Sequence, residues 1–110
     1  MKNGMSFVGG SGRSYRFAEV AEDSDWAAEA GVAVFAARGA YGWILVRAAD
    51  LRGRADDLSA IWAWREARRY GASAVFLARS PSAADRAALL ADLQAGMRPI
   101  LSSAAAVLAA

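Results

Sequence analysis

Two β-rich runs on either side of a short glycine-containing turn constrain the fold of this chain more than any other feature. Residues 31–36 read GVAVFA and residues 41–46 read YGWILV, with residues 38–40 (RGA) between them. Val, Ile, Phe, Tyr and Trp favour strands, and a glycine in a short connection between two such runs is typical of a β-hairpin. This part of the chain is therefore expected to form antiparallel sheet.

A helix is expected after the hairpin, over residues 50–70. Asp50 is a candidate N-cap, and Asp56 with Asp57 offers a second start, so the helix is either continuous or broken between the two. The apolar residues of this stretch form one stripe and its arginines lie on the other side. Gly71 is expected to end the helix as its C′ residue.

A third buried strand and a last helix complete the pattern. The strand is expected at residues 74–78, which read AVFLA. Ser82 and Asp85 then resemble a capping box, and the leucines that follow fall on one helical face. Gly96 and Pro99 are expected to end this helix.

The 110 residues suit a single domain with short ends. Residues 1–13 are expected to be a flexible arm, residues 14–101 the folded domain, and residues 102–110 an Ala-rich tail. Residues 14–20 alternate apolar and polar side chains and form a candidate extra strand. The expected fold class is α+β, a small, mostly antiparallel sheet of three core strands, with that candidate N-terminal strand, flanked by helices.

Two residue types are missing from the composition, cysteine and histidine. Their absence excludes disulfides, zinc–thiolate sites, iron–sulfur clusters and a cysteine nucleophile, and it removes the commonest general base. No signal peptide and no membrane-spanning run is visible, so a cytoplasmic protein is expected, with no membrane partner. We expect no cofactor, no metal, no small-molecule substrate and no enzyme activity.

Two polar segments are candidate ligand-binding sites, and each also has a simpler interpretation as a solvated loop or arm. The glycine-rich residues 9–12 are not preceded by an expected strand or followed by a helix, as a phosphate loop requires, which favours a flexible arm. Glu22, Asp23 and Asp25 could hold a divalent cation, but a solvated acidic loop is the favoured interpretation, with Trp26 packing back into the body.

Arginines and tryptophans supply the candidate binding residues. The formal net charge is only +2, which allows nucleic acid without requiring it. Trp62 and Trp64 point about 200° apart on one helix, so one of them is expected at a surface or interface. The candidate nucleic-acid-binding residues are Arg47, Arg52, Arg54, Arg65, Arg68 and Arg69, and the candidate interface residues are Trp43, Trp62 and Trp64.

Several of these segments occur in an order with a known counterpart. Residues 31–33 (GVA) and 44–46 (ILV) occupy the places of a Gly-Ile-Tyr and a Tyr-Ile-Gly triplet, with ten residues between them. Arg54 falls on a helix-borne arginine, and residues 68–72 match an Arg-Arg-x-Gly-Ala ending. In this order and spacing, residues 14–101 resemble the GIY-YIG nuclease superfamily, with Arg98-Pro99 in the place of a terminal Asn-Pro element.

The same resemblance argues against nuclease activity. The positions of the two triplet tyrosines hold Ala33 and Ile44, and the second glycine is Val46. Leu90 stands where the resemblance implies a metal-binding glutamate, just ahead of Asp-Leu. A hydrolase of this kind needs a metal ligand and a group that activates water, so the resemblance implies an inactive domain.

Two functions from different classes follow. The first is a catalytically inactive GIY-YIG-like domain that binds DNA or acts as a regulatory module through its arginines. The alternative is a protein–protein interaction or assembly module, a homodimer or a subunit of a complex, that does not bind nucleic acid. One contiguous arginine stripe would favour DNA, whereas arginines paired with Glu66, Asp56 and Asp57 would not.

Overall fold

The computed structural model describes residues 4–54 and 56–109, and of residues 97–109 it describes only the path of the backbone. Its elements are β1 (Gly4–Val8), β2 (Ser14–Val20), the short 3₁₀ helix η1 (Trp26–Ala28), β3 (Ala30–Gly39), β4 (Gly42–Arg52), α1 (Leu58–Arg69), β5 (Ala74–Arg79) and α2 (Ala83–Ala109). The fold class is α+β, as expected: a curled antiparallel sheet with two helices.

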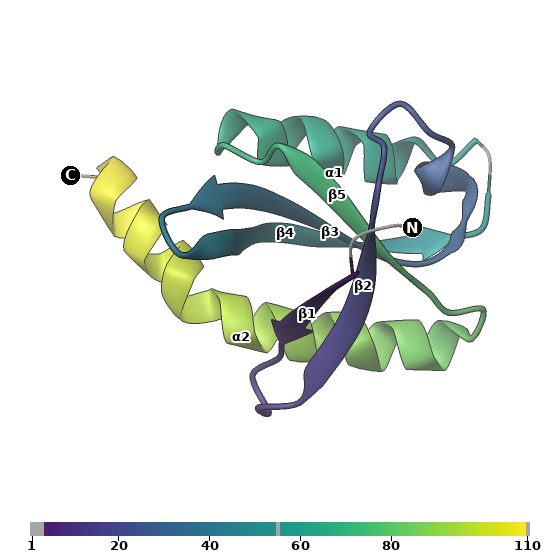
Figure 1. Ribbon diagram of the computed structural model, residues 1–110, viewed down its shortest axis with the longest axis horizontal. Helices are drawn as coiled ribbons and strands as arrows, with labels where there is room; N and C mark the ends of the chain where they lie inside the picture. The colour runs from purple at the N-terminus through teal and green to yellow at the C-terminus, as the bar shows by residue number, and fades with distance from the viewer. Residues whose placement is uncertain (1–3, 55, 110) are drawn as a thin grey trace.

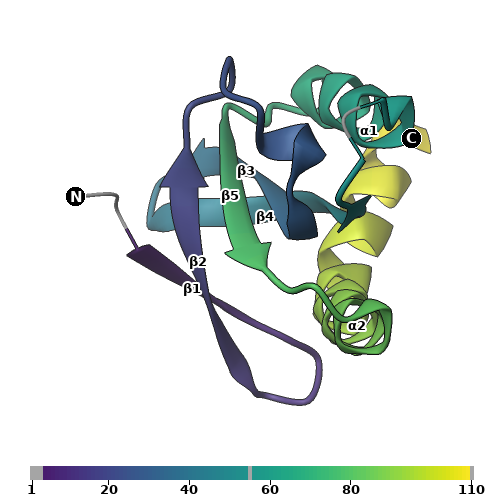
Figure 2. The same cartoon turned by 90° about the vertical axis from the view of Figure 1, so that its right-hand side faces the viewer.

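The sheet has five strands in the order β1-β2-β5-β3-β4, with every neighbouring pair antiparallel (Figure 1). The expected hairpin is confirmed as β3 and β4, and the expected strand at residues 14–20 is β2. The count of three core strands with one candidate extra strand is too low, because β1 also joins the sheet. Figure 2 shows the β1–β2 hairpin turning away from β3 and β4, which gives the sheet its curl.

The expected arm over residues 1–13 is corrected for the part that the structure describes. Residues 4–8 form β1, and the following turn contacts α2 through Asp92. The Ser11 backbone N–H and hydroxyl donate to this carboxylate at 2.8 and 2.7 Å, and the Tyr15 hydroxyl donates at 2.6 Å. These hydrogen bonds lower the pKa of Asp92 and raise that of Tyr15. Residues 1–3 lie outside the described residues.

The helix expected over residues 50–70 begins later than its first candidate cap. Asp50 lies within β4, which continues to Arg52 in register with β3. The N-cap is Asp57, whose side chain accepts from the Ser59 backbone N–H at 3.1 Å. Long-range strand pairing therefore overrides a local cap signal. Gly71 is confirmed as the C′ residue, at φ +98°.

The last helix is also longer than expected. Ser82 caps it as predicted, its hydroxyl accepting from the Asp85 backbone N–H at 3.2 Å. α2 then continues through Gly96 and Pro99 to Ala109, taking in most of the Ala-rich tail. A single proline removes one backbone hydrogen bond, and the helix is supported on either side by alanines, the best helix formers, up to residue 95 and again from residue 104. Gly96 does not end the helix. It allows α2 to approach the β1–β2 turn, because a Cβ there would lie about 3.0 Å from the backbone of that turn.

The helices cover opposite faces of the sheet, and side chains along β3 alternate between two hydrophobic clusters. Ala33 and Phe35 face α1, while Val32, Val34 and Ala36 face α2, and all are fully buried. Both helices lie closest to β4, the edge strand, so that β4 runs between them (Figure 2). This placement brings α1, α2 and the free edge of the sheet together.

Candidate functional site

The outward side of α1 carries an exposed stripe of two apolar and two basic residues. Leu58, Trp62, Arg65 and Arg69 lie on the side opposite the buried alanines of the helix. Leu58 is 65% and Trp62 63% exposed, and the Arg65 guanidinium stacks over the Trp62 ring at 5.1 Å. We call these four residues the α1 face.

The structure separates the three candidate interface tryptophans. A separation of about 200° requires one exposed member of the helical pair without saying which; it is Trp62, and Trp64 is 6% exposed. Trp64 packs on Phe35 at 5.3 Å, so its assignment as an interface residue is corrected to a core position. Trp43 is half-buried against Phe76, under Arg38.

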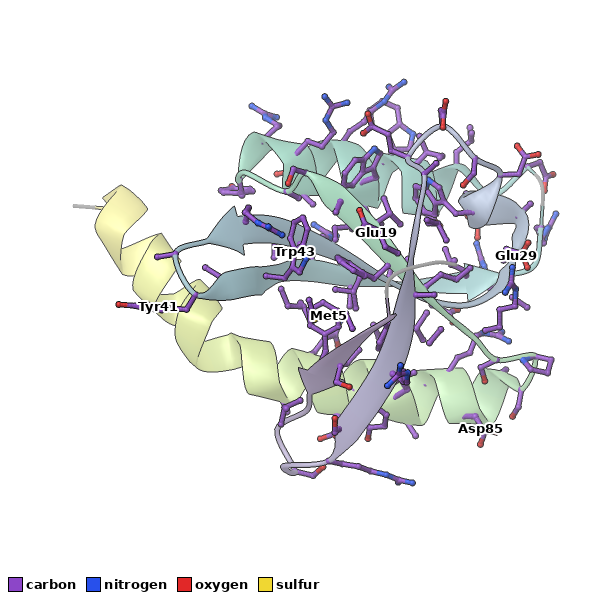
Figure 3. The ribbon with its side chains drawn as sticks, viewed as in Figure 1. Met5, Glu19, Glu29, Tyr41, Trp43 and Asp85 are labelled. Carbon is purple, nitrogen blue, oxygen red and sulfur yellow. The ribbon has the colours of Figure 1, made fainter. Side chains whose placement is uncertain are left out.

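A second exposed aromatic lies at the tip of the β3–β4 hairpin. Figure 3 shows Tyr41 there, apart from Trp43, and Tyr41 is fully exposed. Tyr41 was not among the interface residues expected from the sequence, although its place beside the predicted glycine turn was a signal. A lone exposed aromatic needs no functional explanation, and Tyr41 serves below as a control position.

Three of the six candidate arginines are paired with nearby carboxylates. Arg52 donates hydrogen bonds to Asp57, Arg54 forms an ion pair with Asp56 at 3.4 Å, and Arg69 lies 3.8 Å from Glu66. Within the described ranges, no carboxylate lies within 4 Å of the other three candidates, which are Arg47, Arg65 and Arg68. Arg68 instead stacks over Trp64 at 5.7 Å. The arginines therefore do not form one uninterrupted basic stripe.

Asp57 connects Arg52, at the end of β4, to the start of α1. Its buried carboxylate accepts from the Ser59 backbone N–H and from its hydroxyl, and Arg52 donates to both of its oxygens at 3.3 Å. The hydrogen bonds from Ser59 and then from Arg52 lower the pKa of Asp57 to about 2, against the opposing effect of burial.

Replacing Asp57 with alanine is expected to lower the free energy of unfolding by about 1–2 kcal/mol at neutral pH, through loss of the cap. Because the folded pKa is depressed, the carboxylate stabilises fully above its unfolded pKa of about 4 and loses this effect as the pH falls towards 2. Urea unfolding of both proteins at pH 7, 4 and 2 checks this. A difference that stays constant across the three pH values would contradict the assigned cause.

A groove lies at the free edge of β4, between α1 and α2. Its volume is about 330 Å³. Alanines of β4 and α1 form much of its lining, and Arg47, Asp50 and Arg52 supply its charges. Leu90 of α2 closes one side. We call this cavity the β4 groove.

A buried arginine supports this groove from behind, and sequence reasoning missed it. Arg86 on α2 donates to Asp50 at 2.8 Å and to the backbone carbonyl oxygens of Ser80 and Pro81 at 3.1 and 2.9 Å. Its side chain is only 8% exposed. No local pattern marks it, because its partners lie on another strand and in a loop.

The positions that carry the GIY-YIG resemblance do not converge in one place. Ala33 belongs to the cluster under α1, whereas Leu90 packs on the cluster under α2. Arg54 lies after β4 and outside the lining of the β4 groove. Gly31, the retained glycine, lies where β5 passes closely, and a Cβ there would meet the backbone of Ala78.

The two other candidate clusters are also placed. Residues 9–12 form the β1–β2 turn, and Glu22, Asp23 and Asp25 are all exposed. Among the residues that the structure describes, no three His, Cys, Asp or Glu side chains come together as metal ligands would. No helix in the described part of the chain is both long and apolar enough to cross a membrane.

Comparison with known proteins gives no relative: no family model, curated protein or solved structure matches this chain.

Proposed function

We propose that this domain is an assembly module that pairs two copies of its own chain through the α1 face. The observation that carries the proposal is Trp62, 63% exposed, with Leu58 equally exposed one helical turn before it. Tryptophan and arginine are the residues most enriched among those that dominate binding energy at protein interfaces. Here one tryptophan lies between a leucine and two arginines on a single helix face.

Charge along α1 favours a second copy as the occupant. Asp56, exposed, comes just before the helix, and Arg65, Arg68 and Arg69 lie towards its end. When two such helices pack antiparallel about a two-fold axis at Trp62, the arginines at the end of each lie beside the exposed Asp56 of the other, which Arg54 approaches to 3.4 Å in its own copy. Arg69 of one copy then lies beside Asp56 of the second copy, and this contact occurs twice.

The size of the face predicts the strength of the pairing. The 12 residues of α1 span about 18 Å, so one helix-to-helix contact buries less than the roughly 800 Å² per partner of a standard interface. We therefore expect a reversible dimer with a dissociation constant in the micromolar range or weaker, populated where the chain is concentrated or held in a larger assembly.

DNA binding is the competing function, and the ion pairs weigh against it. A phosphate backbone is recognised by arginines free to neutralise it, and three of the six candidates have a carboxylate within 4 Å that repels phosphate. The proposal keeps the GIY-YIG resemblance as a hypothesis about fold and assigns the domain no nuclease step. The apolar side chains at Ala33 and Leu90, on opposite faces of the sheet, support that choice.

Trp62→Ala is expected to leave the free energy of unfolding within about 0.5 kcal/mol, since the ring is exposed, and to weaken self-association at least tenfold. Sedimentation velocity over protein concentrations from about 10 µM to 1 mM measures the association. Tyr41→Ala removes a fully exposed aromatic from another surface and serves as the control. A protein that stays monomeric throughout the range contradicts the proposal.

Charge reversal tests the antiparallel arrangement directly. Arg69→Asp and Asp56→Arg should each weaken the dimer, and the double variant should restore it, because the two charges face each other between copies. Anisotropy of a labelled DNA duplex at 50 and 200 mM salt tests the competing function. Tight binding that falls steeply with salt, with no self-association, would favour a DNA-binding module instead.

A further inference from the structure

We infer that the β4 groove is a second binding site, one that takes an extended acidic peptide as an added strand next to β4. This site is separate from the α1 face and does not depend on dimer formation. The inference rests on the free edge of β4, on the shape and lining of the groove, and on its charge.

The free edge of β4 provides the backbone groups that an added strand needs. β4 is the last strand of the sheet and pairs only with β3. In the described part of the chain, no backbone hydrogen bond from a loop, turn or cap reaches the residues of β4. Within the described residues its outward N–H and C=O groups therefore have no backbone partner, which is what peptide binding by strand addition requires.

The lining of the groove comes from both a strand and a helix. One wall is β4 itself, through Ala48 and Ala49, and the facing wall is α1, through Ser59, Ala60 and Ala63. These small side chains leave space beside the edge that larger ones would fill. A groove between an edge strand and a helix holds an extended chain, with main-chain hydrogen bonds on one side and side-chain contacts on the other.

The charges of the groove select the partner. Arg47 is exposed and has no carboxylate within 4 Å in the described ranges. Arg52 gives two of its five N–H groups to Asp57, which offsets its charge, and its other N–H groups remain able to donate, so among the described residues Arg47 supplies the unpaired positive charge of the groove. The one carboxylate in the lining, Asp50, is already neutralised by Arg86 at 2.8 Å. The groove is thus positive on balance and suits carboxylates.

The spacing of the two arginines defines the peptide further. Arg47 and Arg52 are five residues apart on one strand, so their side chains leave opposite faces of the sheet. An added strand contacts both when it carries acidic residues five positions apart. Between them, small β-branched residues fit the space beside Ala48 and Ala49.

The test uses a fluorescein-labelled hexapeptide, Glu-Val-Thr-Thr-Val-Glu, which reads the same in both directions and so fits parallel or antiparallel addition. We expect saturable binding by anisotropy, and at least tenfold weaker binding with the isomer Val-Glu-Thr-Glu-Thr-Val, whose acids are two apart. Two further peptides are methylated on alternate backbone nitrogens, one on the odd and one on the even positions, so that each lacks the N–H donors on one edge. The peptide that lacks the donors facing β4 should bind at least tenfold more weakly.

Protein variants locate the site. Arg47→Glu should weaken binding of the hexapeptide at least tenfold, whereas Arg13→Glu, at another exposed arginine on the β1–β2 turn, should not. Bound peptide should also slow hydrogen exchange of outward amides among residues 47–50. Absence of binding overturns the inference. So does binding that both methylated peptides retain, because that outcome shows a contact of charge alone.

Discussion

Phe35→Ala is expected to lower the free energy of unfolding by about 3–5 kcal/mol, enough to leave little folded protein if the domain has ordinary stability. Phe35 is fully buried at the centre of the cluster under α1. Its ring meets Trp26 edge-on at 5.5 Å and lies tilted against Trp64 at 5.3 Å. Removing it takes away buried area and both aromatic contacts, and it leaves a cavity that two bulky rings cannot easily fill.

Urea unfolding followed by far-ultraviolet circular dichroism measures this loss, with Tyr41→Ala as control. Tyr41 is fully exposed, so its removal should change the free energy of unfolding by no more than about 0.5 kcal/mol. A loss below about 1 kcal/mol at Phe35 would mean that Trp26 and Trp64 move to fill the space, and that α1 is held less rigidly than its contacts indicate.

The features that could be predicted from the sequence are those fixed by residues close together in the chain. The hairpin follows from strand-forming runs around a glycine turn, and it is confirmed as β3 and β4. Gly71 at φ +98° and Ser82 with its hydrogen bond to Asp85 are also local signals, and both are confirmed. The opposite exposure of Trp62 and Trp64 required only helix geometry.

The features that could not be predicted depend on partners distant in sequence. The glycine-rich stretch before residue 14 resembles a mobile arm, but Asp92 on α2 holds its turn through Ser11 and Tyr15. Asp50 resembles a helix cap, but pairing with β3 keeps it in a strand, where Arg86 reaches it across 36 positions of sequence. A local propensity gives way when long-range pairing satisfies more backbone groups.

The candidate site shows the same division. Clustering of arginines in the sequence could not show which of them have carboxylate partners, and those ion pairs now weigh against DNA binding. Trp62 could be expected at a surface only as one of two alternatives. The β4 groove had no sequence signal, because alanines on a strand and a helix form it together.

Arg86→Ala is expected to lower the free energy of unfolding by about 2–4 kcal/mol, the second of the two largest effects. Arg86 is buried and joins α2 to β4 through Asp50 and to the β5–α2 loop through two carbonyl oxygens. Without it these three acceptors must find water in a partly closed space. This loss of unfolding free energy is smaller than that for breaking a fully buried ion pair, because the Asp50 side chain is 38% exposed and water can hydrate it.

Three further variants separate the charge of Arg86 from its shape. Arg86→Lys keeps the charge but cannot reach all three acceptors at once, so it should recover about half of the loss. Arg86→Met keeps the length without the charge and should behave like alanine. Asp50→Asn leaves Arg86 its two backbone carbonyl acceptors and one amide oxygen, and should cost less than Arg86→Ala or Arg86→Met. If Arg86→Met instead matches the wild type in urea unfolding, then the arginine contributes packing alone, and its ion pair with Asp50 adds nothing to stability.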